Sequence, residues 1–146
     1  MDNSSSNPFQ SSYRALMTGL FVGIADAFIG LIFNIAYRSS RPDFSSTFLN
    51  VSYIIFGMVL LFFFIGLLYA VVCRIFSKSD LIFFLLFGAL TILAVWGMHT
   101  TRFSGDLIED ASLRGEYTSI AIIAGVSAAV GIPLLHRSHK FELYVV

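Results

Sequence analysis

One acidic residue lies inside an apolar segment, where it can either do chemistry or link helices. Asp26 is near the middle of an apolar stretch that runs from about residue 15 to residue 37. An ionised carboxylate at the centre of a bilayer costs roughly 2.5–3.5 kcal/mol on insertion scales. Asp26 is therefore expected to face protein rather than lipid. It is either a proton- or ion-binding carboxylate or a protonated side chain that hydrogen-bonds a neighbouring helix.

Small residues share a helical face with Asp26. Gly19, Gly23 and Gly30 lie seven, three and four positions from it, and Asn34 follows it by eight. At 3.6 residues per turn these positions form one stripe. Gly19 and Gly23 make a small-x-x-x-small pattern, which lets another helix approach closely. We interpret the stripe as a helix-packing face that includes the carboxyl group.

Two hydroxyl groups are expected at the depth of Asp26. Thr91 and Ser127 fall near the middle of later apolar stretches if the helices alternate in direction. We predict that one or both lie within hydrogen-bonding reach of Asp26. The hypothetical proton or ion site consists of Asp26, Thr91, Ser127 and Asn34. Asn34 can also meet Asn50, or bind water, near the ends of the first two stretches.

The composition indicates a membrane protein. The chain has 146 residues, of which 57% are apolar and 12% charged, whereas a soluble domain is about half apolar and a quarter charged. A chain this short cannot hide so much apolar surface in a core. Its nine basic and nine acidic residues cancel, so no positive field attracts nucleic acid. A soluble globular protein, a disordered tail and a nucleic-acid binder are therefore excluded.

Four apolar stretches follow a polar beginning. Residues 1–14 are predicted to be a flexible tail, and residues 15–146 a single domain. The stretches cover about residues 15–37, 48–76, 81–98 and 118–135. Since about 20 residues cross the hydrocarbon layer, the second stretch is overlong and should tilt or project. Short links predict antiparallel neighbours. The predicted fold is all-α, a polytopic membrane protein with a four-transmembrane-helix antiparallel bundle.

The third connection, residues 99–116, is long and acidic. Leu107, Ile108 and Ala111 occur there at helical spacing, which indicates a short helix on the membrane surface. The alternative is an irregular acidic loop. Every charge other than Asp26 is assigned to a tail, a loop or a helix end.

The fourth stretch has a packing face of its own. Gly125 and Ala129 are separated by four positions and suit close helix contact. Pro133 comes late enough to end or bend that helix.

The positions of Lys and Arg favour cytoplasmic termini. The side of the termini carries Arg14, Arg74, Lys78, Arg137 and Lys140, and the opposite side carries Arg38, Arg41, Arg102 and Arg114. The side with more basic residues is expected to be cytoplasmic. A different interpretation is that Arg14, the apolar run after it and Ala25-Asp26-Ala27 form a signal peptide. Against it, the apolar stretch continues to residue 37.

The sequence predicts no metal, no cofactor and no enzymatic activity. His99 and His136 end helices of opposite direction, so they are expected at opposite faces and cannot share a metal. His136 and His139 are interpreted as part of an interfacial basic cluster. Cys73 is the single cysteine, so no thiolate cage can form within the chain. The chain has no Walker loop, G-x-S-x-G or H-E-x-x-H motif.

Several segments carry a resemblance to a known group. They are residues 18–23 (TGLFVG), 50–52 (NVS), 66–69 (GLLY) and 122–125 (IIAG). With these segments in this order, the chain resembles small uncharacterised four-helix integral membrane proteins of bacteria. The resemblance implies an inner-membrane setting and a single four-helix unit, and it implies no activity.

The leading functional hypothesis is a non-enzymatic membrane protein. It would be a structural or accessory subunit that packs through Gly and Ala faces. Its partners would be the lipid bilayer and either further copies of itself or another membrane subunit. The alternative is a small proton- or ion-conducting channel or transporter-like protein that uses Asp26. An enzyme acting on a lipid or quinone within the bilayer is a third hypothesis, which the missing motifs disfavour.

Overall fold

All regular secondary structure in the described part of the chain is helical. The computed structural model describes residues 8–40, 51–76 and 78–138. The helices are α1 (Pro8–Ser39), α2 (Val51–Ile75), α3 (Ser79–Thr100), α4 (Leu107–Val126), the π-helix η1 (Ser127–Gly131) and α5 (Ile132–Arg137). Four segments within them are long and apolar enough to cross a membrane: Ser12–Ser39, Val51–Ile75, Ser79–Thr100 and Leu107–Arg137. The predictions of an all-α chain and of four such helices are confirmed.

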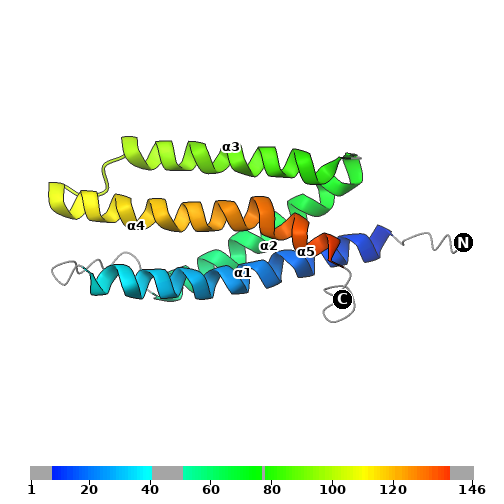
Figure 1. Cartoon of the computed structure of the whole chain (residues 1–146), viewed down its shortest axis with the longest axis horizontal. Helices are drawn as coiled ribbons and strands as arrows, with labels where there is room; N and C mark the ends of the chain where they lie inside the picture. The colour runs from blue at the N-terminus through cyan, green and yellow to red at the C-terminus, as the bar shows by residue number, and fades with distance from the viewer. Residues whose placement is uncertain (1–7, 41–50, 77, 139–146) are drawn as a thin grey trace, which may run out of the picture.

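The helices form two pairs. α1 packs along α2, and α3 packs along α4, whereas α2 and α3 contact each other much less although a short turn joins them. Figure 1 shows α3 at the top, α4 with η1 and α5 in the middle, and α1 below. The two pairs are joined mainly through contacts of α1 with α4 and α5. α4 is therefore the element that connects α3 to the rest of the molecule.

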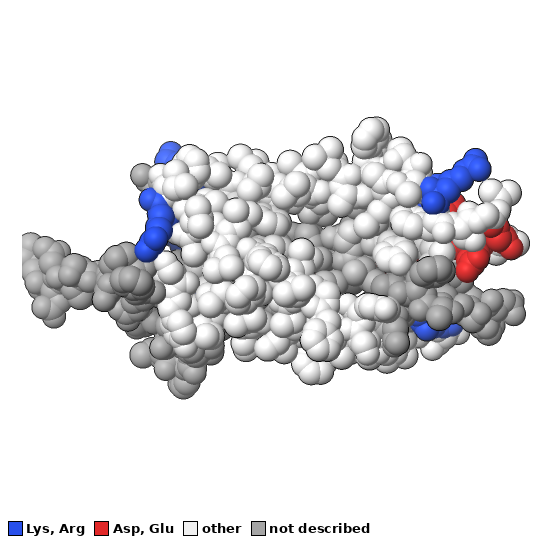
Figure 2. Space-filling view, turned by 180° about the vertical axis from the view of Figure 1, so that it is seen from behind, with Lys and Arg blue, Asp and Glu red and all other residues white. Residues whose placement is uncertain are grey.

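On one face of the molecule the exposed charged side chains gather at its two ends (Figure 2). On the face in Figure 2, blue and red atoms lie at the ends and uncharged side chains cover the length between them. Many large apolar side chains of the helices are exposed, such as Phe28, Phe56 and Ile92 at 64%, 78% and 71%. Such a surface suits a hydrocarbon environment better than water.

The first helix begins earlier than predicted. α1 starts at Pro8, so residues 8–14 are helical and the expectation of a flexible tail to residue 14 is wrong for them. Proline is favoured at the first position of a helix, where its missing N–H has no partner in any case. The apolar stretch marks the length suited to hydrocarbon, and a helix can continue beyond it. α2 begins at Val51, and residues 48–50 lie outside the described residues.

The long acidic connection is mostly helix. α4 begins at Leu107 and continues without a break into the fourth apolar stretch. Asp106 caps it, because its side chain accepts a 2.9 Å hydrogen bond from the Ile108 backbone N–H. The predicted surface helix is thus the first part of α4. The prediction that it is separate from the fourth apolar stretch is wrong. Acidic residues in the first turn, Glu109 and Asp110, favour this helix start.

A widened turn interrupts the last helix before Pro133. Residues 127–131 form the π-helix η1, and Pro133 lies just after it. Proline lacks an N–H and its ring collides with the carbonyl four residues earlier, so the preceding turn has to widen or kink. The widened turn thus accommodates the proline, and the chain remains helical to Arg137.

α1 and α2 cross at a point where each helix has a glycine, Gly19 in α1 and Gly66 in α2. A Cβ atom added to Gly19 would lie 2.7 Å from the Phe62 carbonyl oxygen and 2.8 Å from the Gly66 Cα. A Cβ added to Gly66 would lie 3.2 Å from the Gly19 Cα. Because these neighbours are backbone atoms, no side-chain rotation can make room. Gly23 and Gly30 also face α2, against Phe62 and Ile54.

The crossing predicts the effect of one added methyl group. We expect Gly19→Ala to lower the free energy of unfolding in detergent by about 1–3 kcal/mol, the usual cost of overpacking. Gly57→Ala is the matched control, since a Cβ there meets nothing within 4 Å and alanine favours helix. Equal stability of the two variants would contradict the close α1–α2 contact.

Candidate functional site

Asp26 is buried and hydrogen-bonded to the last long helical segment. Its side chain is 1% exposed. The Ser127 hydroxyl donates to Asp26 Oδ1 over 2.6 Å. Asp26 Oδ2 is also buried and has no hydrogen-bond partner among the described residues. The carboxyl group thus links the middle of α1 to the first residue of η1 through one oxygen, and no described residue bonds the other.

Thr91 has a different role from the one predicted for it with Asp26. Its hydroxyl donates to the Phe87 carbonyl of its own helix over 2.7 Å. A Cβ added to Gly125 would lie 2.0 Å from Thr91 Oγ1, so Thr91 fills the space above that glycine. Gly125 is therefore a contact point between α4 and α3. Ala129 is buried one turn later, at 5% exposed.

A second buried carboxyl group, that of Glu116, lies on α4 and also faces α1. Glu116 is 0% exposed, and Asn34 donates to its Oε1 from Nδ2. Arg38 approaches the same oxygen, with Nε at 3.9 Å. Glu116 Oε2 is buried and has no hydrogen-bond partner among the described residues. Asn34 is thus used by Glu116, and Asn50 lies outside the described residues.

Sequence reasoning placed Glu116 in the third connection and missed this pair. The assignment of every charge other than Asp26 to a tail, a loop or a helix end is wrong for Glu116. The sequence did contain a signal, because Ser112, Glu116 and Ala124 are separated by multiples of four. The structure shows that all three are buried. Positions four apart share a helix face. The charged character of residues 106–116 hid that pattern.

A third contact completes the line between α1 and α4. The Tyr37 hydroxyl donates to the Ser112 carbonyl over 3.0 Å, and it sits where a Cβ of Gly115 would be, at 2.6 Å. We call the contacts Asp26–Ser127, Asn34–Glu116 and Tyr37–Ser112 the α1–α4 seam. Along this seam, residue numbers rise in the α4–η1 segment as they fall in α1.

The predicted stripe on α1 serves two neighbours. Its glycines contact α2, whereas Asp26 and Asn34 contact the α4–η1 segment. A face that spans less than half of the helix circumference is wide enough to touch both helices. The stripe therefore does not bring the glycines and the carboxyl to one partner.

The opposite end of the bundle holds another polar group. Tyr69 is 0% exposed, and its hydroxyl donates to Asp80 Oδ1 over 2.6 Å. Arg137 approaches Asp80 Oδ2 at 3.7 Å. The His136 ring meets the Tyr69 ring edge to face, with centroids 5.1 Å apart. These contacts tie α2, α3 and α5 together at the end where α1 begins.

The histidines do not gather at one site. His136 lies against Tyr69, whereas the His99 carbonyl accepts from Arg114 at the α3–α4 connection. His139 lies outside the described residues. Among the residues that the structure describes, no group of three His, Cys, Asp or Glu could hold a metal ion.

Comparison with known proteins adds no relative. No protein-family model matches the chain, and no match was found among curated proteins or solved structures. The geometry of the seam therefore carries the functional argument by itself.

The seam can do one of two things chemically. A carboxyl that accepts from a hydroxyl or amide and keeps a buried oxygen can be protonated and simply bridge helices. The same carboxyl can take up and release a proton or a cation if water reaches it. Both uses require Asp26 and Glu116 to face protein, as they do.

If the Asp26 carboxyl bridges helices, its bond to Ser127 should contribute measurably to stability. In a double-mutant cycle of Asp26→Leu and Ser127→Ala, measured by unfolding in detergent or bicelles, we expect a coupling of about 0.5–1.7 kcal/mol, the range of hydrogen bonds between membrane helices. Asp26→Asn should destabilise less than Asp26→Leu, since the asparagine oxygen can still accept from Ser127. As a control, Ser119→Ala removes a hydroxyl that donates within its own helix, to the Gly115 carbonyl, and should show no coupling to Asp26→Leu.

Proposed function

We propose that this chain is an integral membrane protein without enzymatic activity, a structural or accessory subunit of the bacterial inner membrane. Its four long apolar helices would span the bilayer as an antiparallel bundle. The uncharged middle and the charged ends of the face in Figure 2 support this placement. So does the exposure of large apolar side chains along the helices.

The observation that carries the proposal is the Asp26–Ser127 bond. It gives the one acidic residue in the middle of α1 a packing role, because the carboxyl joins α1 to the α4–η1 segment. Asn34–Glu116 repeats the arrangement nearer the end of the bundle. In hydrocarbon, polar links of this kind hold helices together where apolar contact alone gives no preference over lipid.

The outer face of α3 supports a subunit role. Within the described chain, Phe83 and Phe87 are the residues of α3 that are buried. A Cβ added to Gly88, which lies on the side of α3 away from these two residues, would meet nothing within 4 Å. A glycine on an open face of a membrane helix allows a further helix to approach closely. We propose that this face packs against a second copy of the chain.

The distribution of charge supports cytoplasmic termini. At the end where α1 begins, the described basic residues are Arg14, Arg74, Lys78 and Arg137, and at the other end they are Arg38, Arg102 and Arg114. Four against three follows the direction of the positive-inside rule.

Site-directed cross-linking tests the subunit role. In a Cys73→Ser background, a membrane-permeable bifunctional maleimide is applied to native membranes containing either Gly88→Cys or Gly57→Cys. Both positions are open glycines, on α3 and α2, so they form a matched pair. We expect a cross-linked dimer from Gly88→Cys and monomer from Gly57→Cys. Monomer from both, or equal dimer from both, would overturn self-association through α3.

Two observations favour a proton or ion site as the second candidate function. Asp26 and Glu116 each keep a buried oxygen with no partner among the described residues. In addition, the partner of Asp26 is the first residue of a π-helix, and such widened turns are frequent at functional sites. A relay would use Asp26 in the middle and Glu116 near the end, where Arg38 is part-exposed.

Flux measurements decide between the two candidates. If the seam carries protons or cations, purified protein in liposomes should dissipate an imposed gradient, and Asp26→Asn and Glu116→Gln should each reduce the flux at least tenfold. Ser119→Ala is a suitable control, since the Ser119 hydroxyl lies outside the seam and donates to the Gly115 carbonyl of its own helix. Flux that is absent, or unchanged in both carboxyl variants, removes the transport function and leaves the structural one.

A further inference from the structure

A pocket of about 540 Å³ lies beside the first half of α4, where α3 stops. The Arg114 guanidinium bonds the His99 carbonyl, so the end of α3 lies level with the second turn of α4 and α4 projects beyond it (Figure 1). The projecting helix forms one wall of the pocket and His99 another. The lining residues are His99, Leu107, Asp110, Ala111, Arg114, Gly115, Thr118 and Ser119.

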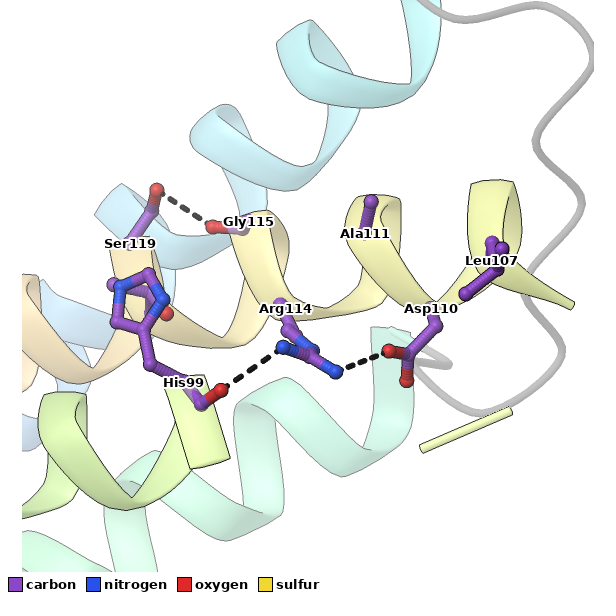
Figure 3. A pocket seen from close by; sticks show the side chains of 8 residues that line it. His99, Leu107, Asp110, Ala111, Arg114, Gly115 and Ser119 are labelled. Carbon is purple, nitrogen blue, oxygen red and sulfur yellow. Dashed lines mark hydrogen bonds and ion pairs between the residues drawn. The ribbon is translucent and has the colours of Figure 1, made fainter. Parts of the chain in front are cut away.

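Arg114 is fixed in this pocket by both helices. Its Nη1 donates to the His99 carbonyl over 2.9 Å, and its Nη2 donates to Asp110 Oδ2 over 2.5 Å. Figure 3 shows the guanidinium held between these two groups. Arg114 Nε is buried and has no hydrogen-bond partner among the described residues. A guanidinium held in place loses little entropy on binding an oxyanion, and its planar fork suits phosphate.

Other polar groups of the pocket can also donate. The Thr118 hydroxyl is buried and has no partner among the described residues. The His99 side chain is exposed at the end of α3. Ser119 already donates to the Gly115 carbonyl over 2.9 Å, which leaves its oxygen to accept. Arg114 and His99 therefore present hydrogen-bond donors to the pocket, and rotation of the Thr118 side chain would add its hydroxyl; donors of this kind bind phosphate.

Asp110 sets the net charge of the pocket close to zero. Its Oδ1 accepts from the backbone N–H groups of Phe103 and Ser104, at 2.5 and 3.2 Å, and its Oδ2 accepts from Arg114. The carboxylate is thus occupied in closing the α3–α4 connection. It offsets the charge of Arg114, so the pocket would recognise an anion by its hydrogen bonds and not by long-range attraction. A phosphodiester meets this requirement without a high net charge.

The pocket lies at the level of lipid headgroups if the helices span the bilayer. α3 has 22 residues, which is about 33 Å of helix against a hydrocarbon layer of about 30 Å. His99, next to its last residue, would then lie at the boundary. Leu107, at 78% exposed, and Ala111 add an apolar edge to the pocket. An occupant with a phosphate and an apolar part fits both kinds of lining.

We propose that this pocket binds the phosphodiester headgroup of a membrane phospholipid. Arg114, Thr118 and His99 would hold the phosphate oxygens, and Leu107 and Ala111 would contact the glycerol and upper acyl chain. The inference rests on the proposed membrane placement of the chain. It is independent of the roles proposed for Asp26 and for the outer face of α3.

Native mass spectrometry of the full chain in detergent tests the proposal. A short-chain phosphatidylglycerol is titrated against wild type, Arg114→Gln, Thr118→Val and Arg102→Gln, with inorganic phosphate as a parallel ligand. Thr118→Val removes one hydroxyl and keeps the side-chain shape, so it folds even if Arg114→Gln disturbs the connection. Arg102→Gln removes the same charge at the same end, outside the pocket lining. We expect about tenfold weaker lipid binding in the first two variants, equivalent to about 1.4 kcal/mol, and wild-type binding in Arg102→Gln.

Each other outcome counts against the proposal. Equal lipid binding in all four proteins means that the pocket is not the phosphate site. Inorganic phosphate that binds as tightly as the lipid, with the same loss in Thr118→Val, means that the occupant is free phosphate. Carbonate extraction of native membranes tests the membrane placement separately. A chain that stays in the membrane fraction but fails the titration overturns the headgroup site alone.

Discussion

A carboxyl group buried in an apolar helix needs a hydrogen-bond partner on another helix, and this constraint determines how α4 lies on α1. Asp26 finds its partner in Ser127, and Asn34 provides one for Glu116. Two such contacts fix the rotation and the register of one helix against the other, because each polar atom would otherwise be left unpaired in an apolar setting. Apolar contacts alone allow sliding.

The rest of the molecule follows from the position of α4. α3 is attached chiefly through α4, where Thr91 fills the space above Gly125. α2 is attached to α1 by the close backbone contact at Gly19 and Gly66. Within the pairs, α1 and α2 meet through backbone atoms at glycines, and α3 and α4 meet where the Thr91 side chain covers Gly125. The two pairs are joined to each other by side-chain hydrogen bonds. Different physical interactions act within the pairs and between them.

The same polar beginning of α4 serves folding and the proposed lipid pocket. Asp106 and Asp110 start the helix and close the connection from α3. In doing so Asp110 also orients Arg114. A helix that projects beyond its neighbour exposes its polar first turns beside that neighbour's end, which creates a concave surface there. A charged segment that looks like a loop in the sequence is in this way both a structural element and a candidate binding surface.

Sequence alone determined that the chain forms four long apolar helices, because the length and composition of each apolar stretch can be read without knowledge of its neighbours. It also singled out Asp26, since a charge in an apolar run stands out without any knowledge of neighbours. It missed that Glu116 is buried, that residues 107–116 belong to α4, and that Thr91 packs on Gly125. Those features depend on which faces of separate helices meet. Only the tertiary structure decides that, because the partners are distant in the chain, as Asn34 and Glu116 are, 82 residues apart.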